Sequence, residues 1–352
     1  MKKVLYIVED KRAPQFRYRV ENLMEVLRDS DEWKVEYVLK SGLDDLELET
    51  YSLIVIERQT AKDNLVLKLT KKAKRVGIKV LFDIDDLVFD YRDLKLVYST
   101  VGEKNIFYWA GYFWGIRRIA KRVDGFLCTN DYLGRKLKKS FGKPYKVIPN
   151  SLNKKQVDSS EKIKNEKKSR GCFLVGYFSG SPTHANDFRL IEPELIGFLK
   201  SHDDVTLKVI GDMSYSDEMK RMIDDGRVKA FAKVDYLKLL ELIAKVDVNL
   251  APLIVNDFTN CKSELKFFEA AVVETTTIAS PTYVFKKAIS DGENGFLARV
   301  GEWQNKLEYL YEHPEENRKI AKRAYEYVLK HYYGKEFSKE VEAAYNYFGD
   351  GK

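Results

Sequence analysis

Three carboxylates lie close together at the end of an apolar run in the first half of the chain, where the sequence reads FDIDD over residues 82–86. A carboxylate at a strand end can act as a general base on a hydroxyl group. We therefore expect Asp83 and Asp85 to be catalytic, with Asp85 as the first candidate for the base, and Asp86 to bind the substrate that carries the hydroxyl. Two other interpretations remain open, namely an Asp-x-Asp metal site and capping of a helix by Asp85 or Asp86.

A second group of reactive residue types lies in the segment CKSELKFFE, which ends at Glu269. The pattern predicts a helix over 263–273 with Ser263 and Glu264 in its first turn. The free N–H groups and the positive dipole end of such a turn suit a diphosphate, whose charge Lys262 would neutralise. Glu269 would share a face with Lys262 and accept hydrogen bonds from a ribose. An ordinary solvated helix face is the alternative.

An arginine-rich segment, RAPQFRYR, spans residues 12–19 after the first apolar run. Pro14 is favourable at the first position of a helix, so the pattern predicts a helix over 14–28. Arg17 and Arg19 would then reach a phosphate on a substrate, because guanidinium groups bind phosphate through paired hydrogen bonds. Simple solvation of at least one of the two arginines is the alternative.

Aromatic and basic residues occur together, without an acidic residue, over 106–122, and a second acid-free basic stretch covers 133–146. This combination is typical of helices that lie on an anionic membrane surface. The alternative is that the aromatic residues form the buried face of a helix. No RNA-binding motif accompanies the two stretches, so we expect no nucleic-acid partner.

The three cysteines and four histidines are too scattered for a disulfide framework or a zinc site. No glycine-rich dinucleotide motif follows the first apolar run, which argues against a nicotinamide dehydrogenase. That run is short and ends in two carboxylates, and no long apolar stretch occurs elsewhere. We therefore expect no signal peptide, no membrane span and a cytoplasmic protein.

Short apolar runs alternate with longer amphipathic stretches along the chain, which predicts parallel βαβ units with right-handed crossovers. The fold class expected is α/β, with two doubly wound Rossmann-like sheets facing each other across a ligand-binding cleft, and a helical tail. The expected strands cover 4–8, 35–39, 53–57, 79–82, 125–128, 146–148, 173–178, 206–210, 228–232, 247–251, 276–279 and 295–298. The other expected helices cover 62–76, 105–122, 131–141, 185–200, 216–224, 235–246, 281–289, 301–313 and 316–332, with a short final helix after Gly334.

Composition and charge divide the chain of 352 residues in the same way. Residues 153–170 are polar and charged, and we expect them to be a linker between domains at 1–152 and 171–330. We expect the C-terminal segment 331–352 to be a helix that packs back on the first domain. The net charge of +7 resolves into +8 over 1–152, +4 over the linker and −5 over 171–352. The first domain therefore favours an anionic partner.

Five segments of the second half, in order, resemble the nucleotide-sugar-binding domain of GT-B glycosyltransferases, in particular bacterial family 4-like enzymes (glycosyl transferases group 1). They are VGYFSGS from 175, VIGD from 209, AP at 251–252, CKSELKFFE from 261 and DGENGFLA from 291. The first half resembles the family more loosely, through FDIDD and through VIPNS over 147–151, which is similar to the family's crossing between domains.

The resemblance implies a GT-B fold and a retaining, metal-independent glycosyltransferase without a cofactor. The donor would be a nucleotide sugar of unknown base, and the acceptor a glycan or lipid-linked glycan in bacterial surface polysaccharide or glycoconjugate synthesis, at the inner face of the cytoplasmic membrane. Lys262 would stabilise the leaving group, and Asp85 would be the base if the enzyme inverts. Acceptor contacts would come from Arg17, Arg19 and Asp86. Donor contacts would come from Ser179, Gly180, Ser181, Gly211, Lys262, Ser263, Glu264 and Glu269.

The sequence departs from the family pattern at three places. Cys261 stands where the family has the first glutamate of a pair, Glu274-Thr-Thr replaces a Gly-x-Pro, and no Arg and Lys follow Ser181. These departures keep two alternatives open. One is a non-catalytic GT-B relative that binds a nucleotide sugar or glycan as a partner subunit, and the other is another nucleotide-sugar enzyme such as an epimerase.

Overall fold

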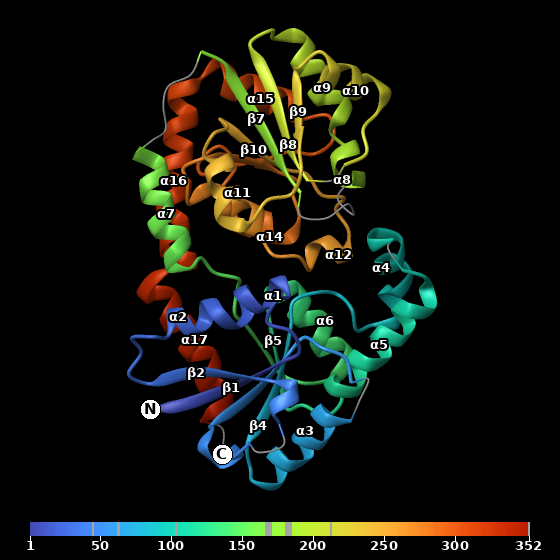
Figure 1. Cartoon of the computed structure of the whole chain (residues 1–352), viewed down its shortest axis with the longest axis vertical. Coiled ribbons are helices and arrows are strands. Elements are labelled where there is room, and N and C mark those ends of the chain that lie inside the picture. Colours follow the sequence, from blue (N-terminus) through green and yellow to red (C-terminus); the bar gives the residue numbers. More distant parts are fainter. Residues whose placement is uncertain are drawn as a thin grey trace. The chain divides into compact units, whose positions relative to one another are not determined.

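The computed structural model describes residues 1–43, 46–61, 64–102, 104–165, 171–179, 185–211 and 213–350. The chain divides into two compact units. The first comprises Met1–Asn153, Asn260–Ser263 and His331–Lys352, and the second comprises Lys154–Thr259 and Glu264–Lys330. Each unit contains one six-stranded sheet flanked by helices (Figure 1). The expected pair of doubly wound α/β sheets is thus confirmed.

The first sheet has the strand order β2-β1-β3-β4-β5-β6, and its pairings are parallel. Its strands are short apolar runs because helices cover both faces of a parallel sheet. The direction of the chain across the sheet switches between β1 and β3, and such a switch point is where open α/β sheets bind ligands. The strands are β1 (Lys2–Val8), β2 (Trp33–Leu39), β3 (Leu53–Glu57), β4 (Lys79–Ile84), β5 (Gly125–Cys128) and β6 (Tyr145–Val147).

The expected helix over 14–28 is interrupted by a π-helical turn, so it consists of α1 (Pro14–Phe16), η1 (Arg17–Glu21) and α2 (Asn22–Val26). Helix α4 was not expected from the sequence. The remaining helices of this unit are α3 (Leu65–Arg75), α4 (Leu94–Val101), α5 (Ile106–Ala120), α6 (Asp131–Phe141) and α17 (Gly334–Gly349), with 3₁₀ turns η2 (Lys40–Gly42), η3 (Leu48–Thr50) and η4 (Tyr91–Asp93).

The second sheet has the order β12-β11-β10-β7-β8-β9, also with parallel pairings, and its switch point lies between β7 and β10. Its strands are β7 (Phe173–Phe178), β8 (Val205–Ile210), β9 (Val228–Phe231), β10 (Val248–Ala251), β11 (Thr276–Ala279) and β12 (Phe296–Leu297). The helices between 154 and 332 are α7 (Lys154–Asn165), α8 (Ala185–Arg189), α9 (Glu192–Ser201), α10 (Asp217–Asp224), α11 (Tyr236–Ile243), α12 (Asp257–Asn260), α13 (Leu265–Ala271), α14 (Tyr283–Ala288), α15 (Trp303–Glu312) and α16 (Pro314–Tyr332).

Most of the expected linker, residues 153–170, is a helix and not an irregular connection. Helix α7 occupies its first part and belongs to the second unit. Its buried positions include Gln156 and Ser160, which are one turn apart and polar, so the helix carries no hydrophobic stripe for sequence analysis to detect. Lys164 fixes its end by an ion pair with Glu274 (3.4 Å).

Glu274 adopts a positive φ of 51°, a conformation that normally favours glycine. It opens the segment Glu274-Thr-Thr that leads into β11. The ion pair with Lys164 holds the carboxylate, so α7 contacts the residue that adopts this conformation.

The C-terminal helix α17 packs within the first unit, where the red helix lies among blue elements in Figure 1. Phe337 and Val341 join the buried cluster that contains Val4 of β1. The hydroxyls of Tyr6 and Tyr345 share a hydrogen bond of 3.0 Å. With sixteen residues α17 is longer than the short final helix we expected. No helix in the part of the chain that the structure describes is long and apolar enough to cross a bilayer.

Candidate functional site

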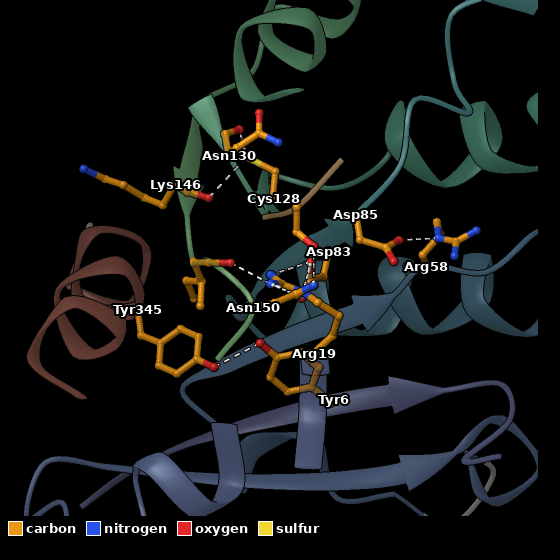
Figure 2. A network of polar contacts seen from close by, with 12 residues as sticks. Tyr6, Arg19, Arg58, Asp83, Asp85, Cys128, Asn130, Lys146, Asn150 and Tyr345 are labelled. Carbon is orange, nitrogen blue, oxygen red and sulfur yellow. Dashed lines mark hydrogen bonds and ion pairs between the residues drawn. The ribbon is translucent and has the colours of Figure 1, made fainter. Parts of the chain in front are cut away.

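A buried ion pair joins Arg19 of η1 to Asp83 of β4 (Figure 2). Arg19 Nη2 lies 2.9 Å from Asp83 Oδ1, and Nε lies 3.1 Å from both carboxylate oxygens. Arg19 Nη1 also donates to Ile148 O (2.6 Å) and to Asn150 Oδ1 (3.2 Å). Burial opposes the charge of Arg19, but Asp83 keeps the pKa of the guanidinium above its ordinary value. The pair therefore connects η1, β4 and the segment after β6.

This burial corrects two expectations. Arg19 was expected to reach a phosphate on the acceptor, and Asp83 was expected to be catalytic, but each side chain is buried against the other. The π-helical turn at 17–21 directs Arg19 toward the sheet. Arg17 is half-buried, with its guanidinium 4.4 Å from the ring centroid of Tyr18, and its role toward an acceptor stays a prediction.

Asp85 follows β4 and points toward Arg58, whereas Asp83 points toward Arg19 (Figure 2). Arg58 also donates to the hydroxyl of Tyr112 in α5 (2.9 Å). Burial opposes ionisation of Asp85, but Arg58 outweighs it and lowers the pKa of the carboxyl below its ordinary value. Asp85 is therefore ionised at neutral pH, as a base must be. The capping alternative is wrong, because no described helix begins at Asp85 or Asp86.

Glu57, the last residue of β3, is a buried carboxyl that sequence analysis did not select. Its strand partner in the register is Asp83. Burial, with a contribution from Asp85, raises the pKa of Glu57 to about 8. Among the described residues, no group hydrogen-bonds its Oε1. Glu57 therefore holds a proton at neutral pH beside the ionised Asp85. The signal that points to it is the one used for FDIDD, a carboxylate that closes an apolar strand.

Lys262 and Ser263 belong to the first unit, in the segment Asn260–Ser263. Lys262 Nζ lies 3.0 Å from Asp86 Oδ1, and Ser263 Oγ accepts a hydrogen bond from Asn150 Nδ2 (3.1 Å). Asn130 Nδ2 donates to the carbonyl oxygens of residues 261 and 262. The structure thus brings together the expected leaving-group cation, Lys262, and the expected acceptor ligand, Asp86.

Helix α13 begins at Leu265 and not at the expected residue 263. Glu264 is its N-cap, and Ser263 and Lys262 precede the helix. The expectation that Lys262 and Glu269 share a helix face is therefore wrong, because the spacing rule applies only within a helix. Glu269 itself is buried on α13.

At the carboxyl ends of β7 and β8, the structure brings together two of the expected donor contacts. Ser179 N donates to Ile210 O (2.8 Å), and the backbone N of Gly211, the residue after Ile210, donates to Phe231 O (2.8 Å). Gly211 has a φ of +112°, and a Cβ there would lie 2.4 Å from Ser179 O. Only glycine, which has no Cβ, allows the backbone to approach Ser179 O this closely. Gly180 and Ser181, the other two donor contacts we expected on this turn, lie outside the described residues.

The segment DGENGFLA forms a turn before the edge strand β12. Asp291 Oδ1 accepts from Leu297 N (2.8 Å), and Gly292 N donates to Gly295 O (2.8 Å). A cavity of about 740 Å³ adjoins this turn, lined among others by Phe296, Lys306 and Tyr309. None of the expected donor residues that the structure describes lines it. The cavity lies beside the edge strand, away from the switch point between β7 and β10, so it is not the donor site that we propose.

Helix α5 carries aromatic residues on two faces. Phe113, Ile116 and Ile119 are buried, whereas Phe107 is 82% exposed and Trp114 is 54% exposed. Part of the basic stretch at 133–146 is already occupied: Lys136 pairs with Asp93, Lys143 donates to two carbonyls, and Lys146 lies over Tyr347. The exposed basic residues near these helices include Lys121, Arg122, Arg135, Lys138 and Lys139.

Residues 192–342 match a family of proteins described as glycosyl transferase-like. This is less than half of the chain. A comparison with curated proteins found no match.

Solved glycosyltransferase structures are similar to the chain over its whole length. HepE of Anabaena in complex with UDP-glucose has a TM-score of 0.64 and 14% identity, over 99% of this chain and 100% of its own. Sucrose-phosphate synthase of Thermosynechococcus elongatus has a TM-score of 0.68 and 15% identity, over 100% of both chains. A glycosyltransferase of Rickettsia africae has a TM-score of 0.67 and 12% identity, over 100% of this chain and 99% of its own.

Proposed function

Because the chain has the GT-B fold and its residues 192–342 match a glycosyl transferase-like family, we propose that it is a glycosyltransferase. The reaction moves a sugar from a nucleotide-diphosphate donor to a hydroxyl of a glycan or lipid-linked glycan. The observation that carries the proposal is the doubly wound sheet of the second unit, in which Ser179 and Gly211 lie at the carboxyl ends of β7 and β8, and helix α13 carries Glu269. A surface-polysaccharide or glycoconjugate acceptor at the cytoplasmic membrane face is part of the proposal.

The donor is a nucleotide sugar in this proposal. HepE, which shares the fold, was crystallised with UDP-glucose. In our chain Glu269 accepts hydrogen bonds from the ribose hydroxyls, and the turn at Ser179 and Gly211 borders the nucleotide. Transfer without a metal and without a cofactor remains our expectation.

The first unit supplies the groups around the acceptor. Asp85 is ionised at neutral pH and is partly exposed, so it can take the proton of an acceptor hydroxyl if the configuration inverts. If the configuration is retained, the departing phosphate takes that proton, and Lys262 stabilises the charge on the phosphate. Retention is the outcome that we propose. The configuration of the product separates the two routes.

The test combines ligand binding with turnover. We expect one nucleoside diphosphate among UDP, GDP, ADP and dTDP to raise the melting temperature, because a ligand of the native state stabilises it. The matching nucleotide sugar should be consumed. Glu269→Ala should lower kcat/KM about tenfold or more, because it removes a buried hydrogen bond to a charged group and such a bond contributes about that much to binding. Glu218→Ala, on the exposed face of α10, is the control.

Four outcomes of this test are informative. Turnover that Glu269→Ala lowers and Glu218→Ala does not supports the proposal and the site. Nucleotide binding without turnover on any glycan would favour the non-catalytic relative. Conversion of the sugar without an acceptor would favour an epimerase. Absence of binding to all four diphosphates would contradict the proposal.

We also propose that the first unit contacts an anionic membrane surface through α5. The exposed Phe107 and Trp114 project from this helix, and the exposed basic residues Lys121 and Arg122 follow it. Apolar side chains that insert at the headgroup level, with cations beside them, are what a peripheral helix requires.

Replacing Phe107 by serine should weaken binding to vesicles that contain phosphatidylglycerol, because it removes the most exposed aromatic ring of α5. The measurement is co-sedimentation at low and high salt, and binding of the unchanged chain should fall as salt screens the charges. Phe231→Ser is a matched control, since Phe231 is 49% exposed on β9 of the second unit. Equal losses in both variants, or no binding by the unchanged chain, would contradict the membrane proposal.

A further inference from the structure

Lys266, the second residue of α13, lies at the switch point of the second sheet. Its backbone oxygen accepts a hydrogen bond from Asn249 Nδ2 of β10 (3.1 Å). Its Nζ lies 4.6 Å from the ring centroid of Tyr177, the penultimate residue of β7. β7 and β10 are the neighbouring strands between which the chain changes direction across the sheet. Lys266 therefore contacts both strands at the place where this kind of fold binds ligands.

The amine of Lys266 is buried, and no described residue hydrogen-bonds it. Burial lowers its pKa to about 8, although the carboxylates of Asp187 in α8 and Glu269 in α13 act in the opposite direction. Asp187 already accepts a hydrogen bond from Ile254 N (2.8 Å). The ring of Tyr177 offers the amine only a cation–π contact. A buried ammonium group without a hydrogen-bond acceptor is unfavourable, so an anionic acceptor at this place would stabilise it.

We propose that Lys266 is the cationic contact of the second unit for the diphosphate group of a nucleotide. The inference rests on the proposed function, because it concerns the same donor. Lys262, which we expected in this role, is paired with Asp86 in the first unit. Lys266 precedes Glu269 by three residues on one helix, so both side chains lie on neighbouring positions of one face. A single nucleotide can then place its ribose on Glu269 and its diphosphate, the next group along, on Lys266.

The first test measures affinity. Isothermal titration with the nucleoside diphosphate that binds the unchanged chain should show about a tenfold or greater loss of affinity in Lys266→Met, the worth of one charge-assisted hydrogen bond. The free nucleoside should bind both proteins equally, because it lacks the phosphates. Lys220→Met, an exposed lysine of α10, is the matched control. Affinity within twofold of the unchanged chain in Lys266→Met would overturn this inference and leave the proposed function standing.

The second test uses the proton on Lys266 and needs no variant that might misfold. An anion that binds the amine raises its pKa, so at pH 8 to 9 binding should take up a fraction of a proton, and affinity should fall as the pH rises. Above pH 8 the phosphate itself is fully ionised and takes up none. Titration in two buffers with different ionisation enthalpies measures the uptake. No uptake by the unchanged chain would overturn the inference.

The stability of Lys266→Met separates a ligand contact from a structural role. The folded-state pKa of Lys266 is lower than the unfolded one, so the folded state binds fewer protons and stability rises with pH between about 8 and 10. Lys266→Met should lack this rise and should melt no lower than the unchanged chain at pH 7. A lower melting temperature together with unchanged proton uptake at pH 8 would assign Lys266 to the core and overturn the inference. If the unchanged chain binds no diphosphate, the proposed function fails, and this inference with it.

Discussion

Replacing Arg19 by alanine is expected to lower the free energy of unfolding of the first unit by about 3–5 kcal/mol, because the change leaves Asp83 buried without its partner. Arg19 also holds Ile148 and Asn150, so the substitution releases the segment after β6 as well. Hydrogen exchange gives the measurement within one sample. Amides of β1, β3 and β4 should exchange faster, while those of β7 and β8 in the second unit serve as an internal reference.

A matched double variant separates the charge from the packing. Arg19→Met combined with Asp83→Leu removes both charges and keeps most of the volume, and such replacements of buried ion pairs are often neutral or stabilising. The double variant should therefore stay within about 1 kcal/mol of the unchanged chain. Native-like exchange in Arg19→Ala would mean that Asp83 finds another partner and that the ion pair does not support the first unit.

Strands were the most predictable elements of the fold. The expected bounds of β3, β5, β7 and β11 coincide with the observed ones. β3, β5 and β7 are short runs of mainly apolar residues, and β11 combines two β-branched threonines with Ile278 and Ala279. Fully buried parallel strands show this pattern in the sequence itself. Helix α7 was missed for the opposite reason, since Gln156 and Ser160 give it a polar buried face. Helix α7 packs against α11 (Tyr236–Ile243) within the second unit, a contact between distant segments that the sequence pattern does not reveal.

The candidate site was predictable by position more than by role. The FDIDD segment does close a strand, but its first carboxylate turns inward to Arg19 and its second meets Arg58. The inward direction of Arg19 follows from the π-helical turn, which shifts the phase of the helix and has no simple sequence signal. Local patterns identify which residue types lie at strand ends, whereas the pairing of their charges depends on contacts between distant segments.

Lys266 illustrates the same limit in the second unit. In the sequence it is one polar position within CKSELKFFE, and Lys262 stands nearer the expected phosphate. The start of α13 at Leu265 leaves Lys262 outside the helix, and Lys266 is the lysine of α13 whose amine lies over Tyr177 of β7. A shift of two residues in a helix start therefore changes which lysine shares α13 with Glu269.

Replacing Gly211 by alanine is expected to destabilise the second unit by about 3 kcal/mol and to displace the backbone of Ser179. Two effects combine in this estimate. The positive φ of Gly211 is unfavourable for alanine by about 1–3 kcal/mol. In addition, the new Cβ would lie 2.4 Å from the backbone oxygen of Ser179, an atom that cannot rotate away as the end of a flexible side chain would.

Comparison with Gly226→Ala isolates the second effect, because that variant has only the first. Gly226 also has a positive φ, of 74°, but a Cβ there meets nothing within 4 Å, so only the conformational cost of about 1–2 kcal/mol applies. Thermal unfolding of the two variants, each with and without the bound nucleoside diphosphate, gives the comparison. We expect Gly211→Ala to lose both stability and nucleotide affinity, and Gly226→Ala to keep its affinity. Equal losses in the two variants would show that the close approach between Gly211 after β8 and Ser179 after β7 does not shape the donor site.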